Sequence, residues 1–146
     1  MKTNLCFLLL FLLTTCGCES QPEGRMKVYR TTGSVTVDGQ PAEGVKIVLY
    51  GATPDLTGPG TVAPYAETDA EGEFSLTSYE SGDGAPAGKF KVTAIWPEPA
   101  PPDADAEFFE PKDLLKDKYL TPDSTPLEAT VEEGSTTLPP FELTTN

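Results

Sequence analysis

Apolar residues recur at every second position through most of the chain after Lys27. A period of two is typical of β-strands that bury one face. The clearest case is the stretch 89–96, in which Phe90 and Val92 alternate with Lys89 and Lys91. The pattern predicts short strands at 35–37, 45–49, 65–68, 74–76, 89–96, 127–131 and 141–143. Because turn signals separate these segments, we predict an all-β fold, a sandwich of about seven antiparallel strands.

Two segments lack this alternation. Residues 51–64 are rich in Gly, Pro and Thr and predict a long loop. Pro97 ends the strongest strand, because proline cannot donate to a β-ladder. The proline-rich, acidic residues 97–105 that follow are typical of an extended, mobile excursion.

A short helix is predicted inside the same insertion. Pro111 suits the first turn of a helix, and Leu115 and Tyr119 are spaced four residues apart, as on one helical face. We therefore expect a helix over 111–120. With the preceding loop it forms a Pro-rich insertion that spans residues 97–126.

The first residues are typical of an export signal. Lys2 precedes an unbroken apolar run of nine residues, Leu5 to Leu13. Nine helical residues reach only about 14 Å, far less than the roughly 30 Å of a membrane core. We therefore interpret residues 1–17 as a signal peptide and not as a membrane span.

The segment Thr14-Thr15-Cys16-Gly17-Cys18 resembles a bacterial lipobox, in which small residues precede a cysteine that is lipidated before cleavage. Gly17 fits the small position before Cys18 better than Thr15 fits the position before Cys16. The sequence thus predicts lipidation at Cys18, with Cys16 as the alternative and an ordinary secretory signal as the other interpretation. Several acyl chains on one cysteine would anchor the protein stably to a cell-envelope membrane, on its periplasmic or cell-surface side.

The rest of the chain divides into a tether and one domain. Residues 18–26 are mainly polar and predict a short tether, and residues 27–146 predict a single sandwich domain. Cleavage before Cys18 would leave that residue as the sole cysteine. No intramolecular disulfide is therefore expected.

The amino-acid composition argues against several classes of function. The chain has no His, and its 10 Lys and Arg face 23 Asp and Glu, for a formal net charge of −13. Without imidazoles there is no usual catalytic triad, histidine base or histidine metal site. The acidic balance argues against nucleic-acid binding through a basic surface. We predict a protein that is not an enzyme and that uses no cofactor or metal.

One acidic cluster offers oxygen ligands of the kind that Ca²⁺ prefers. It consists of Asp103, Asp105, Glu107 and Glu110. The cluster lacks the glycine-punctuated spacing of a dedicated calcium loop. We interpret it as solvated loop charge.

Four aromatic residues are candidates for ligand binding: Trp96, Tyr65, Tyr50 and Tyr79. Exposed aromatic rings at a sandwich surface could stack on sugar rings. Trp96 also shares a strand face with Phe90 and Val92, so a place in the hydrophobic core is the alternative for this residue.

The order of motifs between Gly33 and Trp96 is similar to that of a known family. Three blocks, 33–45 with its Asp38-Gly39 turn, 67–76 and 84–92, resemble the carboxypeptidase regulatory-like domain. The resemblance implies a transthyretin-like (prealbumin-like) Greek-key sandwich of seven strands. Residues 118–134 also resemble the C-terminal part of small bacterial envelope lipoproteins built on this domain.

These observations together predict a non-catalytic function. We expect a cell-envelope lipoprotein that carries a non-catalytic binding or structural module and contacts the membrane through its lipid. One alternative is a carbohydrate-binding module that recognises envelope or environmental polysaccharide. Another is an accessory subunit that binds an envelope protein within a larger complex.

Overall fold

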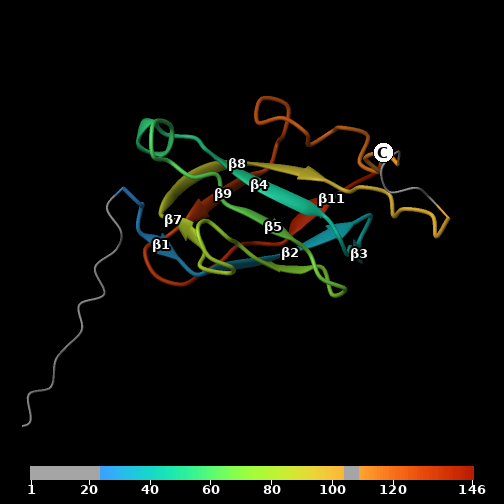
Figure 1. The fold of residues 1–146 in the computed structure, drawn as a ribbon, viewed down its shortest axis with the longest axis horizontal. Helices are drawn as coiled ribbons and strands as arrows, with labels where there is room; N and C mark the ends of the chain where they lie inside the picture. The colour runs from blue at the N-terminus through green and yellow to red at the C-terminus, as the bar shows by residue number, and fades with distance from the viewer. Residues whose placement is uncertain (1–23, 104–108) are drawn as a thin grey trace, which may run out of the picture.

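The fold is that of a computed structural model that describes residues 24–103 and 109–146 (Figure 1). The predicted signal peptide, Cys16 and Cys18 lie outside the described residues, as do Asp105 and Glu107 of the acidic cluster. In the described part of the chain, no helix is long and apolar enough to cross a membrane.

The described residues form an all-β structure, as predicted. One short 3₁₀ turn, η1 (Pro54–Leu56), interrupts the strands. The strands are β1 (Val28–Tyr29), β2 (Thr31–Val37), β3 (Gln40–Pro41), β4 (Lys46–Gly51), β5 (Tyr65–Glu67), β6 (Glu73–Ser75), β7 (Ala85–Pro86), β8 (Gly88–Ile95), β9 (Glu128–Val131), β10 (Thr136–Thr137) and β11 (Phe141–Leu143). All seven predicted strands are present, and β1, β3, β7 and β10 were too short to give an alternation of their own.

One sheet is antiparallel throughout and has the order β5-β4-β8-β9. Its longest ladder joins β4 to β8 from the pair Lys46–Ile95 to the pair Gly51–Phe90. The strongly alternating sequence of β8 therefore lies at the centre of the sheet, where one face is buried and the other is free for polar residues.

The second sheet is built around β2, which pairs with β3 and β6 on one side and with β10 and β11 on the other. The β10 and β11 ladders with β2 are parallel. The expectation that all strands are antiparallel is wrong here. Apolar alternation reports which face of a strand is buried but carries no information on strand direction.

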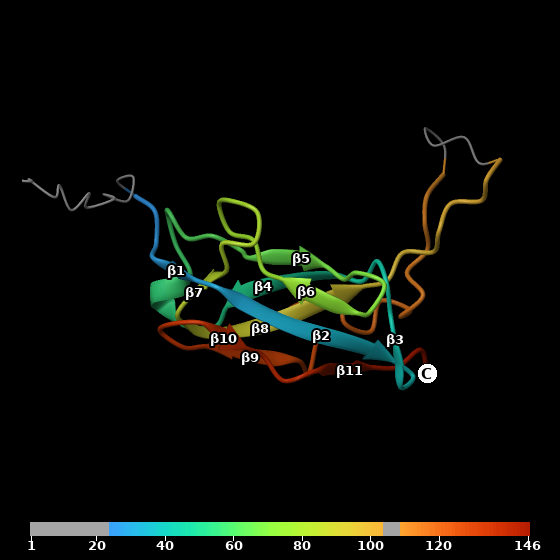
Figure 2. The same cartoon turned by 90° about the horizontal axis from the view of Figure 1, so that it is seen from below.

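The two sheets lie face to face, with β2 crossing in front of β4 and β8 in Figure 2. The inward side chains of both sheets form one buried cluster. Across β2, the rings of Phe74 and Phe141 stack, with their centroids 6.0 Å apart and an angle of 6° between their planes. Gly33 lies beneath this stack, because a Cβ at that position would come within 2.5 Å of Phe74.

The predicted loop 51–64 also contributes to the core. Leu56 of η1 is buried, and its side chain and backbone lie where a Cβ on Gly51 would have to fit. The Leu56 side chain also occupies the space next to Gly88. The two glycines thus let η1 close one end of the sandwich.

The helix predicted over 111–120 is absent, and this segment forms consecutive turns. Lys116 and Asp117 both adopt left-handed backbone conformations, with φ of 56° and 59°, which end any helical run. Leu115 and Tyr119 are nevertheless both buried against the core. The four-residue spacing of Leu115 and Tyr119 correctly predicts that both side chains are buried. The prediction of a helix is wrong.

Candidate binding face

The outer surface of the β5-β4-β8-β9 sheet carries two exposed tyrosines, and we call this surface the tyrosine face. It consists of the side chains that alternate with the buried ones along the four strands. Its members are Lys46, Val48, Tyr50, Tyr65, Glu67, Lys89, Lys91, Ile95, Glu128 and Thr130, together with Thr93, which has the outward register but is buried.

Tyr50 and Tyr65 are brought together by strand register. Tyr65 pairs directly with Val48, and Tyr50 lies two residues further along β4 on the same face. Such diagonal neighbours lie about 7–8 Å apart, within reach of one another's aromatic side chains. Tyr50 is 42% exposed and Tyr65 is 56% exposed. The β4–β5 ladder ends at the Val48–Tyr65 pair, and at Tyr50 β4 is still paired with β8. The two rings therefore form an apolar platform in contact with water at this end of the ladder.

Charged groups frame this platform. Lys91 is the direct β8 partner of Tyr50 and binds Glu128 of β9, with Nζ and Oε1 2.7 Å apart. The hydrogen bond and positive charge of Lys91 hold the pKa of Glu128 below its ordinary value, so this carboxylate is ionised at neutral pH. Lys46 lies at the other end of the face, across from Glu67.

A shallow hollow of about 160 Å³ lies at the Lys89 end of the face. Its lining is Ala52, Lys89, Phe90, Glu128, Ala129 and Thr130. Three of these side chains, Lys89, Glu128 and Thr130, are outward-facing members of the sheet. The hollow is therefore continuous with the tyrosine face.

Trp96 lies elsewhere, at the end of β8. Its indole packs against the hydrophobic core and its Nε1 donates to the carbonyl of Glu43 at 2.9 Å. Its backbone N–H donates to Oδ1 of Asp113 at 2.7 Å. Trp96 is thus partly buried against the core, and it does not lie beside Tyr50 and Tyr65.

Tyr79 is also separate from the platform, in the loop after β6. Its hydroxyl accepts a hydrogen bond from the backbone N–H of Met26 at 2.9 Å. The Arg25 guanidinium carbon lies 4.9 Å from the centre of its ring, and the Arg25 guanidinium also approaches Glu80 at 3.8 Å. The Tyr79 side chain therefore contacts Arg25 and Met26, two residues that the sequence analysis assigns to the tether.

Three aspartates organise loops with their carboxylates. Asp69 accepts from the N–H groups of Glu71 and Glu73, at 3.1 and 2.8 Å. Asp83 accepts from three consecutive N–H groups of the loop at 78–80. Asp113 accepts from three N–H groups as well, those of residues 96, 115 and 117. These carboxylates are engaged in local turn structure.

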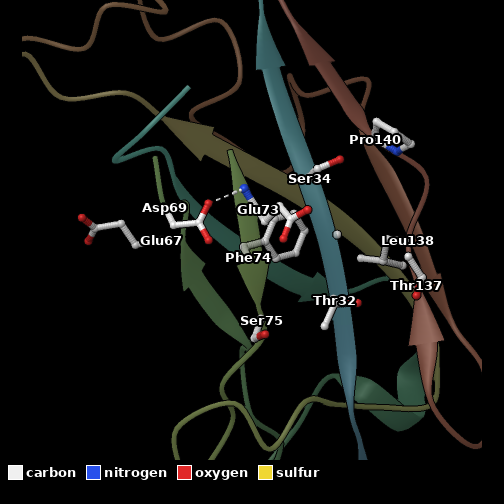
Figure 3. Close-up of a pocket in the computed structure, with 11 residues that line it drawn as sticks. Thr32, Ser34, Glu67, Asp69, Glu73, Phe74, Ser75, Thr137, Leu138 and Pro140 are labelled. Atoms are coloured by element: carbon white, nitrogen blue, oxygen red, sulfur yellow. Dashed lines mark hydrogen bonds between the residues drawn. The ribbon is translucent and has the colours of Figure 1, made fainter. Parts of the chain in front are cut away.

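A larger hollow of about 480 Å³ lies on the other sheet (Figure 3). Its lining is Thr32, Gly33, Ser34, Glu67, Asp69, Glu73, Phe74, Ser75, Thr137, Leu138 and Pro140. Figure 3 shows Asp69 turned toward the backbone N–H of Glu73, while the Glu67 carboxylate is directed away from those of Asp69 and Glu73. The three carboxylates thus do not converge on a common point.

Within residues 24–103 and 109–146, no group of three or more Cys, Asp or Glu side chains is placed to hold a metal ion. Of the acidic cluster, Asp103 and Glu110 are described and are exposed. In the same ranges, every buried side-chain nitrogen and oxygen has a hydrogen-bond partner.

Sequence reasoning selected Tyr50 and Tyr65 but missed the lysines beside them. Lys89 and Lys91 were assigned only to the polar side of their strand. Their relation to Tyr50 depends on which strand pairs with which, and a single strand's pattern does not give this. No protein-family model matches the chain, and no curated protein is significantly similar to it.

Proposed function

We propose that this protein is a lipid-anchored cell-envelope protein whose β-sandwich is a non-catalytic binding module, with the tyrosine face as its binding surface. The observation that carries the proposal is the pair Tyr50 and Tyr65, exposed side by side on paired strands. Large aromatic rings bury considerable apolar area and are common at interfaces. A rigid sheet that holds two of them in water is suited to recognition.

The use of the carboxylates supports a role without catalysis. Asp69, Asp83 and Asp113 each accept two or three backbone hydrogen bonds and thereby shape the loops that contain them. A carboxylate held in this way stabilises a turn and is not directed at a substrate.

The anchor is proposed from the sequence. The apolar run and the lipobox-like residues up to Cys18 support export followed by lipidation. In both views of the fold, strand β1 lies at the end opposite residues 97–103 and 109–112 and the C-terminus (Figures 1 and 2). An N-terminal lipid would thus hold the sandwich by one end and leave the tyrosine face along its side.

We further propose that the sandwich is of the transthyretin-like Greek-key type found in carboxypeptidase regulatory-like domains. Support comes from the turns inside the three resembling blocks. Gly39 and Gly72 both adopt positive φ, 81° and 74°, as such turns require. The two face-to-face sheets agree with this fold but are shared by other sandwiches.

Mass spectrometry of the mature protein tests the anchor. We expect an acylated N-terminal Cys18 in the wild type and loss of acylation in Cys18→Ala, with Cys16→Ala as the matched control. A mature N-terminus at any other residue, or acylation retained in Cys18→Ala, would contradict the assignment.

In-cell crosslinking tests the binding face. The wild type, the Tyr50→Ala/Tyr65→Ala variant and the control Leu120→Ala are compared, because Leu120 is 47% exposed and lies outside the face. We expect the crosslinked envelope material to be lost in the double tyrosine variant alone. Equal crosslinking in all three would refute the proposed binding surface.

A further inference from the structure

We propose that the ligand of the tyrosine face is an anionic polysaccharide. Its sugar rings would lie on Tyr50 and Tyr65, and its carboxylates would pair with Lys46, Lys89 and Lys91. This inference rests on the proposed function, because it names the ligand class of the same surface.

The aromatic platform fits flat, ring-shaped groups. Tyr50 and Tyr65 are diagonal neighbours across the β4–β5 ladder, with half-buried Val48 between them. The strands are fixed by backbone pairing on both sides, since β4 pairs with β8 and Tyr65 exchanges two hydrogen bonds with Thr77. Sugar rings offer apolar C–H faces that can cover such phenol rings, while the phenol hydroxyls remain available for hydrogen bonds.

The charge of the face is opposite in sign to that of the protein. The chain carries a formal net charge of −13. On the tyrosine face, however, the three lysines Lys46, Lys89 and Lys91 outnumber the two acidic residues Glu67 and Glu128. An acidic ligand would be repelled by most of the surface and attracted to this face, so the charge pattern selects the binding orientation.

Two of these ammonium groups are available for a ligand. Within the described residues, the ion pairs are Arg25–Glu80 and Lys91–Glu128. Lys46 and Lys89 are exposed and are not among them. Lys91 is held in place by Glu128, and it keeps further N–H donors for a second acceptor.

The hollow beside Lys89 supplies a place for a substituent. It has a volume of about 160 Å³ and is bounded by the Lys89, Glu128 and Thr130 side chains. Ala52, which is exposed, and the buried Phe90 and Ala129 complete its lining. A substituent projecting from a sugar ring on Tyr50 would meet the Lys89 ammonium and the Thr130 hydroxyl there, and the Glu128 carboxylate on the same rim is paired with Lys91.

The size of the platform favours a polysaccharide over a folded protein partner. Stable protein interfaces bury about 800 Å² on each partner. Two tyrosines supply at most about 150–250 Å² each, and charged residues surround them. A narrow stripe of rings and cations suits an extended polymer that makes the same contact with successive sugars.

Titration calorimetry with the full mature lipoprotein in detergent tests the inference, with polygalacturonate and neutral dextran as the two probes. We expect heat of binding with polygalacturonate only, and weaker binding as salt rises. Tyr50→Ala and Tyr65→Ala should each reduce affinity by about tenfold. Lys46→Gln/Lys89→Gln should reduce both affinity and its salt dependence, whereas the exposed control Lys112→Gln should change neither.

The outcomes separate this inference from the proposed function. Equal binding of dextran, or binding unchanged in Lys46→Gln/Lys89→Gln, would overturn the anionic ligand while keeping the tyrosine face. Absence of binding to both polymers would also overturn it, and the crosslinking experiment would then decide the proposed function independently. Circular dichroism of each variant checks that it is folded, so that a loss of binding heat reports on binding and not on unfolding.

Discussion

Asp38 and Thr145, 107 residues apart in the sequence, are joined by two hydrogen bonds. The Thr145 hydroxyl donates to Oδ2 of Asp38 at 2.6 Å, and its backbone N–H donates to Oδ1 at 3.2 Å. Asp38 lies in the tight turn between β2 and β3, where it adopts a φ of 49°. Lys118 binds the same C-terminal segment through Oγ1 of Thr144, at 2.7 Å. The final residues thereby connect the first hairpin to the 113–126 segment.

We predict that Asp38→Asn destabilises the protein at neutral pH and has no effect in acid. The hydrogen bonds from Thr145 hold the pKa of Asp38 below its ordinary value of 3.8. The carboxylate therefore stabilises the folded state fully above the pKa of the unfolded chain, and this stabilisation is lost as the pH falls through the lower, folded pKa. Asparagine tolerates the left-handed turn position, so the change removes the charge while sparing the backbone.

Urea unfolding from pH 7 to pH 2 measures this effect. The gap between the wild-type and Asp38→Asn midpoints should close in the acid range. Asp103→Asn, at an exposed loop position, is the matched control and should show no such gap. A gap that stays constant at all pH values would show that the Thr145 contact does not depend on charge.

We predict that Gly33→Ala destabilises the sandwich by about 1–3 kcal/mol, the usual range for an overpacked core. The new methyl group would come within 2.5 Å of the Phe74 ring and disturb its stack on Phe141. Ser34→Ala, on the outward side of the same strand, is the control and should have little effect. Chemical denaturation measures all three proteins.

A second substitution identifies the cause. Phe74→Leu shortens the side chain that meets the new methyl group, so the loss in Gly33→Ala/Phe74→Leu should be smaller than the sum of the two single losses. Additive losses would show that Gly33 is required for another reason, such as strand geometry.

The sequence was most informative where one face of a strand is buried. In β8, Phe90, Val92 and Ala94 all face the core, so both the position of the strand and its inward residues were predictable, although Thr93 between them is buried as well. The same reasoning failed at residues 111–120. There burial of Leu115 and Tyr119 is achieved by turns, and their left-handed residues are Lys and Asp, which give no glycine signal.

The candidate site was predictable only in part. Exposure of Tyr50 and Tyr65 follows from their position opposite buried neighbours in alternating strands. Their proximity to each other and to Lys91 depends on the pairing of β4 with both β5 and β8. Strand pairing is a long-range property that local periodicity does not determine. For the same reason, the contact of Trp96 with Glu43 could not be predicted.

We predict that Asp113→Ala loosens the insertion that follows β8. Its carboxylate accepts hydrogen bonds from the N–H groups of Trp96, Leu115 and Asp117, at 2.7, 3.0 and 3.0 Å. Loss of a side chain that caps several backbone donors costs about 2 kcal/mol. Hydrogen exchange followed by mass spectrometry should show faster exchange in residues 113–120, together with a lower unfolding temperature. The exposed control Glu133→Ala should show neither change, and unchanged exchange in Asp113→Ala would contradict the capping role.

Tyr79 holds Arg25 and Met26 against the fold, and limited trypsin digestion can measure this. The Tyr79 hydroxyl accepts from the Met26 N–H at 2.9 Å, and its ring lies 4.9 Å from the Arg25 guanidinium carbon. Tyr79→Ala removes both contacts, so we expect markedly faster cleavage after Arg25. Tyr79→Phe keeps the ring and should be intermediate, while Tyr50→Ala should cleave like the wild type. Equal rates in all four proteins would mean that Tyr79 does not hold Arg25 and Met26 against the fold.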